Sequence, residues 1–141
     1  MEVALNLLTT YIFAIGCVVI IFIFFYPRSI SRETLQNYVK TCVIEENIST
    51  KDLKLFMAWD LANVSNEGKC FFSCFHEKIG LTINGVLQKK IAFGHLKRIF
   101  DRETADILLG ECINLMGKNK CETAYQFEKC LFKIEYNRLA K

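Results

Sequence analysis

Six cysteines constrain the fold of this chain more than any other feature of its sequence. They are separated by 27, 3, 37, 8 and 8 residues, at Cys42, Cys70, Cys74, Cys112, Cys121 and Cys130. An even number of cysteines in a short, apparently secreted chain indicates a disulfide framework rather than a redox or metal site. The spacing alone leaves every pairing of the six open. A seventh cysteine, Cys17, lies apart from the set in an apolar N-terminal stretch.

Residues 1–27 are interpreted as a signal peptide. Residues 11–26 form an unbroken apolar run, which at an N-terminus indicates either a secretory signal or a membrane anchor. The run is short for a bilayer span, which favours the signal, although no Lys or Arg precedes it and no small-residue cleavage site closes it. We expect cleavage within residues 26–29 and one secreted, extracellular domain over residues 28–141; an uncleaved anchor is the alternative.

The charge of the predicted domain is small and dispersed. Glu2 is the only charged residue of the leader, so its removal changes the formal net charge from +3 to +4. The densest basic pairs are Lys89-Lys90 and Lys97-Arg98, which is too little for a nucleic-acid-binding surface. We therefore expect no nucleic-acid partner.

Apolar residues after Pro27 recur at helical spacing, and no further proline interrupts them. This pattern predicts an all-α fold. Ser31, Ser49 and Asp101 are expected N-caps, and Gly80 is expected to end a helix. The expected helices cover about 35–43, 49–63, 69–79, 86–93 and 101–117, with a last one from 119 through Cys130.

The aromatic content suggests a hydrophobic cavity inside these helices. Three disulfides, each worth about 2–4 kcal/mol, exceed what a solid core of this size requires. They are more useful if the interior is partly hollow, because a cavity forfeits packing contacts. A solid aromatic core fits the composition at least as well. The candidate walls are Phe56, Trp59, Phe71, Phe72, Phe75, Phe93, Phe100, Phe127 and Phe132.

In its specific form, the cysteine spacing resembles the six-cysteine signature of insect odorant-binding proteins of the pheromone and general-odorant type. Residues 68–80 (GKCFFSCFHEKIG) look like the third helix of that family, and residues 121–130 look like its sixth. The resemblance covers essentially the whole predicted domain. It departs from the family in two respects: many members are acidic, and the tail after Cys130 lacks a proline that relatives often have there.

The resemblance implies a compact domain of about six short helices around a hydrophobic cavity. It also implies a disulfide pairing of first to third, second to fifth and fourth to sixth cysteine. Its functional implication is reversible binding of odorants or pheromones and their transport to membrane receptors. The implied disulfides are Cys42–Cys74, Cys70–Cys121 and Cys112–Cys130.

We expect no enzymatic activity, cofactor or metal. His76 and Glu77 are adjacent, so on a helix they point in different directions and cannot form an oriented base pair. The chain has two histidines and no nucleophile elbow or phosphate-binding loop. His95 has two readings: a surface residue beside Lys97 and Arg98, which we favour, or a pH sensor at a pocket mouth.

Aromatic and aliphatic residues on the expected inner faces are the candidate ligand contacts. Tyr38, Trp59 and Tyr125 combine an apolar body with a polar group that can orient a ligand by one hydrogen bond. Tyr136, in the tail, is a candidate lid residue. Each also fits ordinary packing. The predicted ligand-binding residues are Tyr38, Phe56, Trp59, Phe75, Ile79, Leu87, Ile91, Leu108, Tyr125, Leu131, Phe132 and Tyr136.

Three functions remain open at this point. The first is an extracellular odorant or pheromone carrier, monomeric or weakly dimeric, that serves membrane receptors indirectly. The second is a secreted carrier or scavenger of hydrophobic ligands outside olfaction. The third is a disulfide-rich secreted interaction protein with a solid core and no ligand. Asn47-Ile48-Ser49 and Asn63-Val64-Ser65 are glycosylation sequons, which are accessible to modification in a secreted protein.

Overall fold

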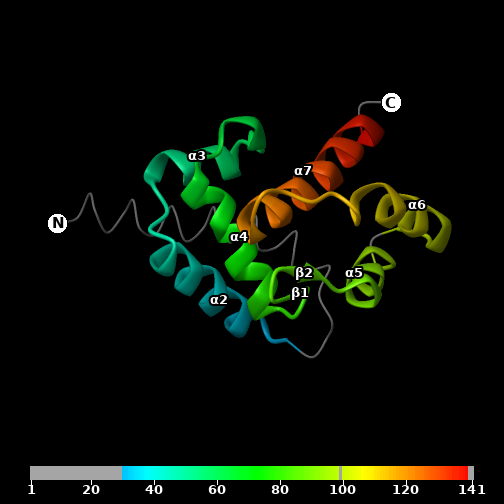
Figure 1. Ribbon diagram of the computed structural model, residues 1–141, viewed down its shortest axis with the longest axis horizontal. Helices are drawn as coiled ribbons and strands as arrows, with labels where there is room; N and C mark the ends of the chain where they lie inside the picture. Colours follow the sequence, from blue (N-terminus) through cyan, green and yellow to red (C-terminus); the bar gives the residue numbers. More distant parts are fainter. Residues whose placement is uncertain (1–29, 99, 140–141) are drawn as a thin grey trace.

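The structure is a computed structural model that describes residues 30–98 and 100–139, without the side chains of residues 136, 138 and 139. The predicted signal peptide, its cleavage region and Cys17 lie outside the described residues. Within them the fold is mostly helical, as predicted, with six α-helices (Figure 1). The elements are α2 (Arg32–Glu45), α3 (Thr50–Met57), the 3-10 helix η1 (Leu61–Asn63), α4 (Asn66–Lys78), β1 (Thr82–Ile83), β2 (Val86–Leu87), α5 (Lys89–Leu96), α6 (Arg102–Cys112) and α7 (Lys120–Leu139).

Side-chain caps fix where several helices begin. The predicted caps Ser31, Ser49 and Asp101 are confirmed: each side chain accepts a hydrogen bond from a backbone N–H three residues later. Ser65 caps α4 in the same way. The carboxylate of Asp52, 1% exposed, accepts hydrogen bonds from Ser49 Oγ at 3.1 Å and from the Ser65 N–H at 2.9 Å. This buried carboxylate therefore links the starts of α3 and α4.

Three helices end with the same backbone geometry. Asn47 after α2, Trp59 after α3 and Gly80 after α4 have φ values of 51°, 58° and 75°. In each case two backbone N–H groups fold back onto carbonyls of the last helical turn. Glycine adopts this left-handed conformation freely and asparagine tolerates it, whereas a bulky side chain there is a strained exception. Trp59 is that exception.

Two of the differences between the observed boundaries and the sequence prediction have a clear local cause. The second helix stops at Met57, six residues before the expected limit at Asn63, because the chain turns at Trp59 and resumes as η1. The fourth helix starts at Lys89 instead of Val86, because residues 82–87 form a two-stranded hairpin. The fifth helix ends at Cys112, well before Gly117. Asn84-Gly85, a dipeptide typical of tight turns, lies between the two strands with positive φ at both residues.

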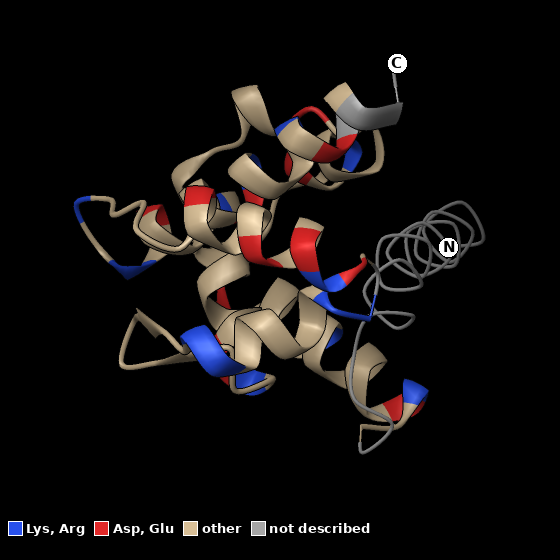
Figure 2. Cartoon of the chain, turned by 90° about the vertical axis from the view of Figure 1, so that its right-hand side faces the viewer, with Lys and Arg blue, Asp and Glu red and all other residues tan. Residues whose placement is uncertain are grey.

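Helices α4 and α7 pack against each other at the centre of the fold (Figure 1). Helix α2 packs on α4 at one side, and α5 and α6 pack together at the other, where α6 also contacts α7. Acidic and basic side chains are interspersed along the helices instead of being sorted by sign (Figure 2), in agreement with the dispersed charge of the sequence. No helix among the described residues is long and apolar enough to cross a membrane.

Three disulfides connect these helices. Cys42–Cys74 joins α2 to α4, and Cys112–Cys130 joins α6 to α7. Cys70–Cys121 joins α4 to α7. These are the same pairs that the family resemblance implied. The central pair of helices is thus bonded covalently to itself and to one helix on each side.

Candidate functional site

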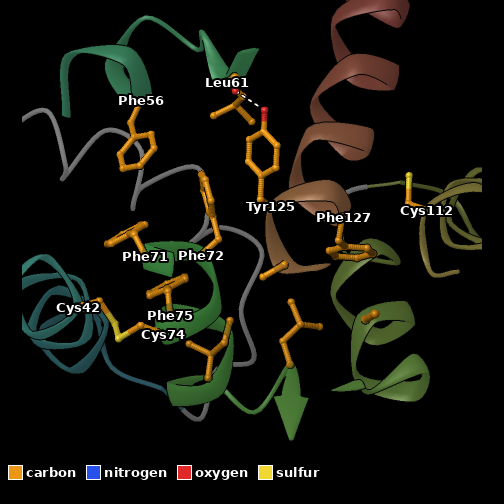
Figure 3. Packing of buried hydrophobic residues seen from close by; sticks show 14 of the residues in the cluster. Cys42, Phe56, Leu61, Phe71, Phe72, Cys74, Phe75, Cys112, Tyr125 and Phe127 are labelled. Carbon is orange, nitrogen blue, oxygen red and sulfur yellow. Dashed lines mark hydrogen bonds between the residues drawn. A yellow bond between two sulfur atoms is a disulfide. The ribbon is translucent and has the colours of Figure 1, made fainter. Parts of the chain in front are cut away.

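A cluster of phenylalanines fills the interior between α3 and α4. Phe56 of α3 lies 5.4 Å from Phe71 and 5.2 Å from Phe72 between ring centroids. Phe71 also contacts Phe75 one turn further along α4, at 6.1 Å. All four rings are at most 8% exposed, and Figure 3 shows them converging from the two helices. The aromatic character expected of a ligand-binding interior is therefore present on this side of α4.

Tyr125 of α7 connects this cluster to the segment that follows α3. Its hydroxyl donates to the carbonyl oxygen of Leu61 at 2.6 Å, and its ring is buried (Figure 3). The ammonium of Lys69 lies 4.7 Å from the centre of the same ring. A buried tyrosine hydroxyl generally needs a partner. Here the partner is a backbone carbonyl, which fixes η1 against α7.

Trp59 makes the second contact between this segment and α7. Its indole meets the ring of Phe132 edge to face, with centroids 4.7 Å apart. Trp59 is 42% exposed, whereas Phe132 is partly buried against the core. The strained backbone at Trp59 thus holds an aromatic side chain at the surface, against the C-terminal half of α7.

A buried polar pair crosses the central interface. Nε2 of His76 on α4 lies 2.5 Å from Oε1 of Glu128 on α7, and the two residues are 0% and 3% exposed. The ring of Phe127 packs edge-on against the imidazole, with centroids 6.1 Å apart. Among the described residues, His76 Nδ1 has no hydrogen-bond partner. A buried basic group of α4 and a buried acidic group of α7 thus meet, and within the described part of the chain Nδ1 of the imidazole makes no hydrogen bond.

Sequence reasoning missed this pair. It tested His76 only against its neighbour Glu77, which points elsewhere and pairs with Lys120 at 3.3 Å. The available signal was helical spacing: His76 lies on the same helical face as Phe72 and Ile79. That spacing predicts burial of His76 but not its partner, because the partner comes from a helix 52 residues away.

The predicted ligand-binding residues occupy three kinds of position. Phe56, Phe75, Ile79, Leu108 and Tyr125 are buried in the core. Tyr38, Leu87, Leu131 and Phe132 are partly buried and packed against it. Trp59 and Ile91 are 42% and 43% exposed. The side chain of Tyr136 lies outside the described part of α7. Contact of any of these residues with a ligand stays a prediction.

A polar pocket of about 900 Å³ lies elsewhere, where α4 and α7 begin. It is lined by Asn66, Lys69, Gly117, Asn119, Glu122 and Gln126 with four neighbours, and by none of the predicted ligand-binding residues. Lys69 Nζ lies 3.0 Å from Glu122 Oε2. This hydrogen bond lowers the pKa of Glu122, outweighing a small opposing effect of desolvation. The Lys69–Glu122 ion pair and the amide side chains in this mixed lining make the pocket a poor match for a purely apolar ligand.

The structure also places His95 and brings one group of possible metal ligands together. His95 lies inside α5 and is half-buried, not on the open surface that we favoured. Among the described residues, Cys42, Glu45 and Cys74 are close enough together to suggest a metal site. Both cysteines belong to one disulfide, however, so neither offers the thiolate that a metal requires.

Comparison with known proteins identifies relatives over most of the chain. Residues 28–134 match the family model described as the PBP/GOBP family. General odorant-binding protein 56a of Drosophila melanogaster is 27% identical over 99 residues, which cover 70% of this chain and 71% of that protein.

Two solved structures are also similar. One is described as a fatty acid binding protein, OBP56a, from the oral disk of the blowfly Phormia regina. It is 27% identical with a TM-score of 0.64, and the match covers 79% of this chain and 99% of the blowfly chain. Odorant-binding protein OBP28a of Drosophila melanogaster matches with a TM-score of 0.59 at 22% identity, covering 74% and 91% of the two chains. At that identity the second match supports the fold alone.

Proposed function

The chain belongs to the PBP/GOBP family of insect odorant-binding proteins, non-enzymatic carriers of small hydrophobic ligands, and on this premise we propose that it is a secreted carrier that transports such ligands through aqueous fluid. Binding is reversible, and no bond is made or broken. Three disulfides are consistent with secretion, because disulfides persist in oxidising extracellular compartments.

The match of residues 28–134 to the family is the observation that carries this proposal. The buried aromatic cluster supports it, because apolar and aromatic side chains line most sites for small hydrophobic molecules. We propose that the ligand lies among the core residues around α4 and α7, with Phe56, Phe75, Ile79, Leu108 and Tyr125 as its walls.

Delivery of odorants or pheromones to membrane receptors is the olfactory form of this function. The blowfly relative favours a second form, because it is described as fatty acid binding and comes from an oral disk. A carrier of long-chain lipids outside olfaction is therefore the alternative that we propose beside it. Both functions need a hydrophobic interior, and they differ in the ligand that is bound and in the tissue where the protein acts.

Displacement of a fluorescent apolar probe, N-phenyl-1-naphthylamine, tests the carrier function. We expect saturable binding at micromolar protein and competition by long-chain esters, alcohols or fatty acids. Absence of saturable binding would overturn both forms and favour an interaction protein without a ligand.

A matched pair of variants locates the binding site. Phe75→Trp adds bulk at a residue that is 3% exposed, whereas Ile107→Trp adds it at one that is 55% exposed. If the ligand occupies the core, the first variant weakens probe binding about tenfold or more while the second leaves it unchanged. Equal affinities would exclude the proposed position.

Tissue expression and a mass-spectrometric inventory of co-purifying molecules separate the two forms. Expression in antennae together with volatile guests supports olfaction. Expression in feeding or reproductive tissue together with long-chain lipids supports the alternative.

A further inference from the structure

The buried His76–Glu128 pair has a spare hydrogen-bonding position that the fold itself does not use. We propose that His76 Nδ1 is the polar anchor of the bound molecule, donating a hydrogen bond to an uncharged acceptor oxygen, such as an ester or aldehyde carbonyl, on an apolar chain. This inference rests on the proposed carrier function and specifies the chemical class of the ligand.

The geometry isolates Nδ1 from both protein and solvent. His76 is 0% exposed, and Nε2 is already engaged by Glu128 at 2.5 Å. Within residues 30–98 and 100–139, Nδ1 finds no partner. Thr82 Oγ1, on the strand that follows α4, is likewise buried without a partner among these residues. Buried polar atoms in native proteins nearly always have a partner, so these two atoms are candidates for hydrogen bonds to water or a ligand.

Charge balance decides whether Nδ1 donates or accepts. A buried carboxylate without a compensating charge is very costly, so burial favours the two arrangements of the pair whose net charge is zero. One neutral arrangement is imidazolium with carboxylate, in which both ring nitrogens carry hydrogen. The other is neutral imidazole with a protonated Glu128 that donates to Nε2, which leaves the ring hydrogen on Nδ1. In both arrangements Nδ1 is an N–H donor.

The surroundings of the pair select the partner of this donor. Phe127 packs edge-on against the imidazole, and Phe72 and Ile79 share its face of α4. The acceptor for the Nδ1 hydrogen bond therefore comes from the bound ligand, or from a buried water that the ligand displaces. An uncharged carbonyl oxygen meets the need without adding charge, whereas a carboxylate would leave the site with a net negative charge. A pure hydrocarbon would leave the donor unmatched.

Two substitutions of His76 separate the anchor from the structural pair. The amide nitrogen of Gln at this position can reach the place of Nε2 and keep the hydrogen bond to Glu128, with no donor at Nδ1. The shorter Asn places its amide nitrogen near Nδ1 and gives up Glu128. The test ligands are methyl dodecanoate and pentadecane, which have equal numbers of non-hydrogen atoms, each competing with N-phenyl-1-naphthylamine.

We expect His76→Gln to weaken binding of the ester about tenfold and to change binding of the alkane less than about twofold. His76→Asn should retain more of the preference for the ester than His76→Gln does. An equal loss for both ligands would reduce His76 to a structural role, and no loss for either would exclude it from the site. Failure of the wild-type protein to bind the probe at all would instead contradict the carrier function.

A measurement on the wild-type protein covers the case in which the variants do not fold. The chain has only two histidines, so ¹⁵N-histidine labelling with His95→Gln as the assignment variant resolves the His76 ring. Saturation with methyl dodecanoate should shift the Nδ1 and attached-proton signals of His76, and saturation with pentadecane should shift them far less. Identical spectra with both ligands would overturn the proposal.

Discussion

The two sides of the central α4–α7 pair differ in the size and chemical type of their buried side chains. On the side of α2 and α3, four phenylalanines interlock, and Asp52 and Tyr125 add buried hydrogen bonds to Ser65 and Leu61. On the side of α5 and α6, the buried residues other than the disulfide-bonded Cys112 are alanines and leucines, namely Ala92, Leu96, Ala105, Leu108 and Leu109. Each side is joined to the centre by one disulfide.

This difference separates two ways of being stable. Large rings provide many contacts per residue, so the stability of the aromatic side depends on the contacts that its rings make. Alanines let helices approach closely, so the stability of the α5–α6 side depends on the small size of its buried side chains. We therefore expect substitutions that remove atoms to lower the free energy of unfolding most on the aromatic side, and substitutions that add atoms to lower it most on the α5–α6 side.

The largest effects should come from the disulfides. Cys42→Ala/Cys74→Ala opens a loop with a sequence separation of 32, and Cys112→Ala/Cys130→Ala one of 18. Chain entropy predicts losses of about 4 and about 3 kcal/mol in the free energy of unfolding. Chemical denaturation measures both. Hydrogen exchange should show faster opening of α6 only in the second variant, and equal opening of both sides would contradict the division.

Truncation of a ring should be the next largest effect. Phe71→Ala removes a ring that contacts Phe56, Phe72 and Phe75 and should cost about 3 kcal/mol. The control Ile107→Ala, at a residue 55% exposed, should cost less than about 0.5 kcal/mol. A cost for Phe71→Ala near that of the control would show that this cluster is loosely packed.

Addition of atoms tests the other side. Ala105 on α6 is 0% exposed, so Ala105→Leu should force α6 away from its neighbours at a cost of about 2 kcal/mol. Gly110→Leu on the same helix is the control, because nothing lies within 4 Å of a Cβ built there. If Ala105→Leu proves neutral, the α5–α6 side contains unfilled space, and a ligand position there gains support.

Loss of one hydroxyl should have a smaller effect. Tyr125→Phe keeps the ring but leaves the carbonyl of Leu61 without its donor, which should cost about 1–2 kcal/mol. Thermal unfolding gives the loss of stability, and faster hydrogen exchange at residues 61–64 gives its location. A stability loss without that local change would assign the effect to the ring packing.

The smallest effect concerns pH. The pKa of Glu122 is lowered mainly by its hydrogen bond from Lys69, so the folded state favours the carboxylate. The resulting stability is present above the pKa that glutamate has in the unfolded chain, and it disappears as the pH falls through the lowered value. For this partly exposed pair we expect about 0.5 kcal/mol. Glu122→Gln should remove this contribution to the pH dependence of stability, while the control Glu77→Gln should leave it in place.

Much of this architecture is predictable because it is local. Ser31, Ser49 and Asp101 cap helices through residues three positions away, and Asn84-Gly85 turns the chain within a hairpin. The end of α3 at Trp59 was missed because tryptophan is not a residue that normally adopts a left-handed conformation. The His76–Glu128 contact was missed because it depends on how two distant helices face each other, which helical spacing does not determine.

The strained end of α3 has a spectroscopic consequence. Trp59 is the only tryptophan of the chain, so all tryptophan fluorescence of the protein comes from one position. Its indole touches Phe132 of α7 at 4.7 Å and is also partly open to water. Its emission should therefore respond to changes in the packing of the α3–η1 turn against α7, with no added label. A ligand that separates these two segments would shift the wavelength of maximum tryptophan emission.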